Sequence, residues 1–86
     1  MNVLAIADAV GWVGALLLLT AYALVSFKRL NGDSTIYQAM NAVAGILLAV
    51  STYYRAAYPS SFLNVVWAII AVVAIVMAVR KHKPLV

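Results

Sequence analysis

The stretch FLNVVWAIIAVVAIVMAV, residues 62–79, decides the fold class, because it is long and apolar enough to cross a lipid bilayer. It contains no Lys, Arg, Asp or Glu, and a spanning helix needs about 20 predominantly apolar residues. One amide, Asn64, interrupts it. An unpaired amide in an apolar medium costs about 2–7 kcal/mol, so Asn64 must have a polar neighbour or face a polar cavity.

The composition of the whole chain also indicates a membrane protein. The 86 residues are 67% hydrophobic and 9% charged, whereas an ordinary soluble domain is nearer half apolar and a quarter charged. A soluble fold of this size buries too little surface to hide so many apolar side chains. The chain has no cysteine, which excludes disulfides and thiolate metal sites. The net charge is +4, and the basic residues that produce it lie at the ends of apolar runs, as they do in membrane proteins. We therefore expect no nucleic-acid partner.

Three apolar segments predict three transmembrane helices, at about residues 9–27, 36–54 and 60–79. Residues 1–86 are expected to form a single domain of the all-α membrane class. The first segment lacks the positively charged start of a signal peptide, so we expect it to be retained. Thr35 followed by Gln38 fits a capping box that opens the second helix, and Pro59 suits the first turn of the third.

Basic residues predict the orientation of the chain. The first loop and the C-terminal tail carry five Lys and Arg residues, whereas the N-terminus and the second loop carry only Arg55. Basic loops stay cytoplasmic, so the N-terminus is expected outside and the C-terminus inside. An outer belt of interfacial aromatic residues would then comprise Trp12, Tyr53, Tyr54, Tyr58 and Phe62, with Phe27 and Tyr37 at the inner side.

Groups for catalysis or metal binding are scarce in this sequence. The only acids, Asp8 and Asp33, lie outside the three expected spans, and His82 lies in the basic tail. No catalytic set, metal-ligand cluster or phosphate-binding loop is present, so we expect neither an enzyme nor a cofactor. A proton-coupled carrier usually keeps an ionisable group within the membrane, and the expected spans have none.

Neutral polar residues are the remaining candidates for solute binding. Depth along the helices places Asn64, Ser51 and Thr52 near the outer side, and Asn41 and Tyr22 nearer the inner side. The two asparagines are then separated by about half of the 30 Å hydrocarbon thickness. Each either bonds a neighbouring helix, contributing about 0.6–2 kcal/mol, or lines a solute path. The rings of Tyr22 and Trp67 either pack or stack on a solute.

Small residues recur at helical spacings of three and four on all three segments. In lipid, such residues let helix backbones approach closely. The residues expected at helix contacts are Gly11, Gly14, Gly45, Ala68 and Ala71.

The sequence resembles the SWEET/PQ-loop-like superfamily, in particular the bacterial SemiSWEET half-transporters and uncharacterised three-helix relatives of that superfamily. The resemblance rests on GWVGALLLLTAY (residues 11–22) and on YYRAAYPSSFLNVVW (residues 53–67), in which Arg55, Pro59 and Asn64 are spaced R-x-x-x-P-x-x-x-x-N. It implies a triple-helix bundle with the third helix between the first and second, in the bacterial inner membrane. It also implies a parallel homodimer whose central pocket is reached by Asn64.

The sequence departs from that superfamily at two positions. Leu24-Val25 stands where the Pro-Gln pair is expected, and Leu48 stands where a sugar-holding tryptophan is expected. The resemblance therefore predicts a carrier of a small neutral or polar solute that works by alternating access, without implying a sugar. The alternative is a membrane assembly or accessory subunit that does not transport.

The charge bias makes the orientation testable. A reporter enzyme that works only in the cytoplasm should be active when it is fused after Val86, and one that works only in the periplasm should be inactive there. The reason is that five of the six Lys and Arg residues are expected on the cytoplasmic side. Paired cytoplasmic and periplasmic reporters measure this directly. A C-terminal fusion that is active only in the periplasm would reverse the assignment.

Overall fold

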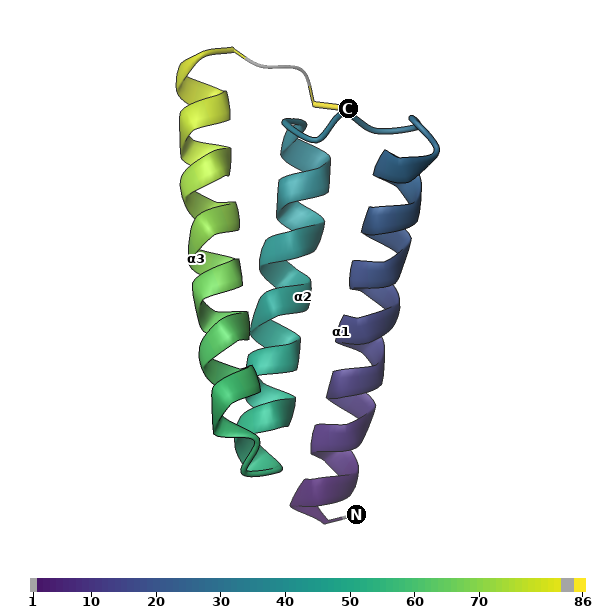
Figure 1. Cartoon of the computed structure of the whole chain (residues 1–86), viewed down its shortest axis with the longest axis vertical. Helices are drawn as coiled ribbons and strands as arrows, with labels where there is room; N and C mark the ends of the chain where they lie inside the picture. The colour runs from purple at the N-terminus through teal and green to yellow at the C-terminus, as the bar shows by residue number, and fades with distance from the viewer. Residues whose placement is uncertain (1, 83–84) are drawn as a thin grey trace.

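Three long helices make up the fold in the computed structural model, which describes residues 2–82 and 85–86 (Figure 1). They are α1 (Val3–Ser26), α2 (Thr35–Tyr54) and α3 (Tyr58–Arg80), and the described residues contain no strand. Each helix is long and apolar enough to cross a membrane. The expected all-α class, with three helices able to span a membrane, is confirmed, and it supports a multi-pass membrane protein.

The helices form a row in which α2 lies between α1 and α3 (Figure 1). Within the described residues, α2 packs against both neighbours, whereas α1 and α3 do not pack against each other. This order differs from the one implied by the SWEET-like resemblance, which places the third helix in the middle. The reason is in the connections, because residues 27–34 and 55–57 are short enough to make consecutive helices antiparallel neighbours.

The start of α1 differs from the sequence prediction and changes the place of Asp8. The helix begins at Val3 rather than near residue 9, because the Asn2 side chain accepts a hydrogen bond from the Ala5 N–H (2.7 Å). Asp8 is therefore inside α1, in its second turn, and the expectation that it lies outside the spans is wrong.

The start of α2 also differs by one residue. The N-cap is Ser34, whose hydroxyl accepts a hydrogen bond from the Tyr37 N–H (3.0 Å), and not the expected Thr35. The Gln38 amide reaches back to the Gly32 carbonyl instead of completing a capping box. Pro59 does lie in the first turn of α3, as the sequence predicts.

Tight turns end α1 and α2 in the same way. Lys28 and Ala56 each adopt a left-handed backbone (φ 60° and 59°) directly after the helix cap. The next residue's N–H then donates to the carbonyl five positions back, from Arg29 to Leu24 (2.8 Å) and from Ala57 to Thr52 (2.9 Å). These Schellman turns satisfy helix-end carbonyls that would otherwise lack partners.

The contact surfaces between the helices are made almost entirely of small residues. Every buried hydrophobic residue in the described chain is an alanine, while most of the large apolar side chains are exposed. Gly14 and Gly45 are also buried at the contacts of α2 with α1 and α3. This arrangement suits lipid, where close backbone contact rather than burial of large side chains drives helix association.

Gly14 provides a test of this close packing. An added Cβ would lie 3.0 Å from the Leu47 Cβ and 3.2 Å from the Ala44 carbonyl oxygen. Gly14→Val should therefore push α1 and α2 apart and lower the free energy of unfolding by about 1–3 kcal/mol, measured by thermal unfolding in detergent. Gly32→Ala is the control, because nothing lies within 4 Å of its Cβ position. Equal stability of both variants would contradict the close α1–α2 contact.

Candidate functional site

A hydrogen bond between α2 and α3 organises a hollow with several polar residues in its lining. The Trp67 indole N–H donates to Asn41 Oδ1 (3.1 Å), and Asn41 Nδ2 donates to the Tyr37 carbonyl (3.0 Å). Asn41 is only 4% exposed, so these bonds satisfy an amide buried about 9 Å along α2. The hollow beside it measures about 210 Å³ and is lined by Tyr37, Gln38, Asn41, Trp67, Ile70 and Ala71.

Asn64 has a different environment from Asn41. It is partly buried, and its side chain makes no hydrogen bond with the described residues. Its backbone carbonyl packs against Gly45, 3.1 Å from where a Cβ would be. Asn64 shares one stripe of α3 with Trp67 and Ala71, three and seven residues further along. Its amide is therefore not used to hold this protomer together.

The remaining candidate residues fall in separate places. Ser51 is buried where α2 meets Gly11 of α1. The Thr52 hydroxyl donates to the Leu48 carbonyl of its own helix (2.6 Å), so it is already partnered. Tyr22 is 67% exposed on α1. The structure thus brings Asn41 and Trp67 together and leaves Tyr22, Ser51 and Thr52 outside their hollow.

Another contact between helices was not anticipated from the sequence. The Ser61 hydroxyl of α3 donates to the Ala49 carbonyl of α2 (3.1 Å). It lies on the same seam as Gly45 against Ala68. Ser61 had no distinguishing signal in the sequence except its place in the first turn of the third helix.

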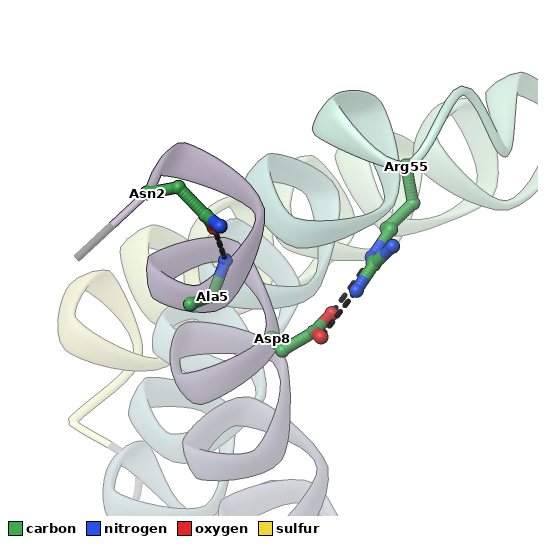
Figure 2. Close-up of polar contacts among 4 residues, drawn as sticks. All are labelled: Asn2, Ala5, Asp8 and Arg55. Carbon is green, nitrogen blue, oxygen red and sulfur yellow. Dashed lines mark hydrogen bonds and ion pairs between the residues drawn. The ribbon is translucent and has the colours of Figure 1, made fainter.

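An ion pair ties α1 to the end of α2. The Arg55 guanidinium donates to both carboxylate oxygens of Asp8, with Nε 2.8 Å from Oδ1 (Figure 2). This hydrogen bonding, with the attraction between the charges, raises the pKa of Arg55 above its ordinary value. Sequence reasoning missed the pair because it placed Asp8 before the helix. The pair also provides the charge compensation that allows an acid in the second turn of an apolar helix.

The hollow with the Asn41–Trp67 bond and the one beside the ion pair open on the same side of the row. The second hollow, of about 280 Å³, lies between α1 and α2 and is lined in part by Asp8, Trp12, Leu48 and Ser51. Leu48 and Asn41 are seven residues apart on α2 and therefore share a face. We call this side, which carries both hollows, the polar face.

The opposite side of the row carries an apolar groove. A groove of about 500 Å³ runs along α2 and α3 there, between residues that include Ile46, Val50, Val65 and Ile69. No polar residue lines it. The two hollows with polar linings and this apolar groove therefore lie on opposite sides of the row.

Comparison with known proteins gives a family but no function. One family model, for a family of uncharacterised proteins, matches residues 7–83. The chain belongs to this family. No curated protein and no solved structure matches it. The match covers all of α2 and α3 and α1 from Ala7 onward, so the Asp8–Arg55 pair and the Asn41–Trp67 bond both lie within the family region.

The Asn41–Trp67 bond can be tested by removing its donor. Trp67→Phe keeps an aromatic ring but leaves Asn41 Oδ1 without its partner at a buried position, and should lower the free energy of unfolding by about 0.6–2 kcal/mol. Trp12→Phe is the matched control, because Trp12 is exposed and donates no hydrogen bond to a described residue. Thermal unfolding of the two variants gives the difference, and equal effects would contradict the inter-helix bond.

Proposed function

We propose that this protein is a carrier of a small, neutral, polar solute, and that it works as a parallel homodimer with the polar faces of two protomers enclosing the path. The observation that carries the proposal is the uncharged hydrogen-bonding hollow of Tyr37, Gln38, Asn41 and Trp67 at membrane depth. Polar groups inside membrane spans are costly and usually serve a substrate path or a helix contact.

The size of the hollow supports a site shared between two copies. Ligand pockets usually measure about 300–1,000 Å³, and this one measures about 210 Å³ and is open on one side. A row in which α1 and α3 do not meet cannot surround a path by itself. A second copy facing it would close the open side and supply the missing half of the site.

The chemistry of the lining favours a neutral solute. No Lys, Arg, Asp or Glu lines the hollow, and amide and indole groups recognise hydroxyl, carbonyl and amine groups by hydrogen bonding. The unbonded amide of Asn64, on the same stripe of α3 as Trp67, extends this set toward the other end of the path. A site built to bond a polar group rejects analogues that lack it, because its own groups are then left unpaired.

Alternating access would come from rocking of the two three-helix rows about the shared site. The SWEET-like resemblance supports the carrier class and the parallel pairing. The central position of α2 differs from the bundle order that the resemblance implies, so the proposal depends on the polar face rather than on that order.

A specific observation favours the second candidate, a non-transporting assembly module. Both polar atoms of the Asn41 amide already have a partner within the protomer, Oδ1 in Trp67 and Nδ2 in the Tyr37 carbonyl. In an assembly module, the hollow would bind no solute and would exist only because Asn41 and Trp67 hold α2 and α3 together. The polar face would then be a surface for another membrane protein.

Asn64 separates the two functions. In the carrier, Asn64→Ala removes no bond within the protomer, so it should change the free energy of unfolding by less than about 1 kcal/mol. It should nevertheless reduce the thermal shift that a bound solute gives to the wild type. The measurement is a thermal-shift screen of the purified protein with sugars, polyols, nucleosides and neutral amides. Asn41→Ala is the control at a fully bonded amide and should destabilise the protein in either case.

Pairing through the polar face is checked in the same preparations. The chain has no cysteine, so single substitutions give clean crosslinks. Ala15→Cys on the polar face should form disulfide dimers in native membranes, whereas Ile46→Cys on the apolar face should not.

The absence of any stabilising solute, together with unfolding or loss of the dimer in Asn64→Ala, would support the assembly module instead.

A further inference from the structure

The two ends of the helix row differ in how their charges are balanced. At one end, Arg55 is paired with Asp8. At the other end, four cations form no ion pair with any described residue: Lys28, Arg29, Arg80 and Lys81. Asp33 lies in the loop at this end as well, but the four cations outnumber it, so this end keeps an excess of positive charge.

One of these cations lies at the mouth of an apolar groove on α1. The groove measures about 400 Å³ and is lined by Leu19, Thr20, Ala23, Leu24, Phe27 and Arg29. Ala23 leaves a gap between the larger side chains of Leu19 and Phe27, which are both strongly exposed. The Thr20 hydroxyl donates to the Leu16 carbonyl (2.7 Å) and is therefore already partnered. Arg29 is the only charged residue that lines the groove.

The groove faces away from the rest of the protein. Ala21 is fully buried against α2. Leu19 precedes Ala21 by two residues and Ala23 follows it by two, so each is turned by about 200° and lies on the opposite side of α1. The groove therefore opens toward the surrounding lipid, at the depth of the last two turns of α1. An acyl chain is the molecule that a lipid-facing apolar groove meets in a bilayer.

The turn after α1 makes the mouth of the groove suitable for an anion. A helix C-terminus normally repels negative charge, but its carbonyls here are already bonded. The Leu24 carbonyl accepts from the N–H groups of Arg29 (2.8 Å) and Leu30 (3.2 Å), and the Val25 carbonyl accepts from Lys28 (3.0 Å). The planar guanidinium of Arg29 matches a phosphate with two parallel hydrogen bonds.

We propose that α1 binds an anionic phospholipid, with its phosphate at Arg29 and an acyl chain in the groove over Ala23. The net negative headgroup distinguishes this lipid from a zwitterionic one, whose own cation competes with Arg29 for the phosphate. Basic sites beside transmembrane helices bind acidic headgroups in this way. The site is independent of the polar face and of the proposed transport function.

Lipid retention by the whole protein tests the site. Native mass spectrometry of the detergent-purified chain should show one phosphatidylglycerol retained per protomer in preference to phosphatidylcholine. Arg29→Gln should weaken phosphatidylglycerol retention about fivefold, the effect of one basic residue near an anionic headgroup. Arg80→Gln removes an equal charge from the same end of the row but away from the groove, and should leave retention unchanged.

A second variant separates the groove from the charge. Ala23→Leu fills the floor of the groove, keeps every cation and should also reduce retention. Glycerol phosphate, which has the headgroup phosphate without an acyl chain, should not compete. Equal retention of both lipids would overturn the proposal, as would equal losses in Arg29→Gln and Arg80→Gln or full retention in Ala23→Leu.

Discussion

The close approach of the helix backbones along α2 is the constraint on which the rest of the structure depends. Gly14 and Gly45 leave no room for a Cβ without displacement of a neighbour, and the buried apolar residues around them are all alanine. In lipid there is no gain from hiding large apolar side chains, so contact between small residues must hold the helices together. The large side chains are consequently free to face the acyl chains.

These contacts also fix the antiparallel register and hence the positions of the polar groups. Toward the C-terminus of α1, each step of three residues is matched by a step of four back along α2: Asp8 meets Arg55, Gly11 meets Ser51, and Gly14 meets Leu47. Between α2 and α3, steps of four residues back along α2 are matched by steps of three along α3, which joins Ala49 to Ser61, Gly45 to the Asn64 backbone carbonyl, and Asn41 to Trp67. The ion pair and the indole–amide bond are thus consequences of one packing register.

The sequence predicted the parts of this structure that depend on one helix at a time. Three spans, their approximate limits and the small residues at the contacts follow from composition and spacing. The helix order did not follow, because the resemblance suggested a different bundle and no single-helix pattern selects between them. The Asp8–Arg55 and Asn41–Trp67 contacts were missed for a related reason. Asp8 and Arg55 are 47 positions apart, and Asn41 and Trp67 are 26 apart, so only the register of a helical hairpin brings either pair together.

The register leaves the two membrane asparagines in different states, and that difference bears on function. Asn41 is buried, and its Oδ1 and Nδ2 atoms each have a partner within the protomer, so removing those partners would leave a costly unpaired amide. Asn64 lies on the same side of α3 as Trp67, but its side chain bonds to no described residue. An amide within a span must find a polar partner, and a protomer whose α1 and α3 do not meet leaves space for that partner on its polar face. In the proposed carrier that partner would be a solute or the second copy at the polar face, which would make Asn64, rather than the bonded Asn41, the amide available to the solute.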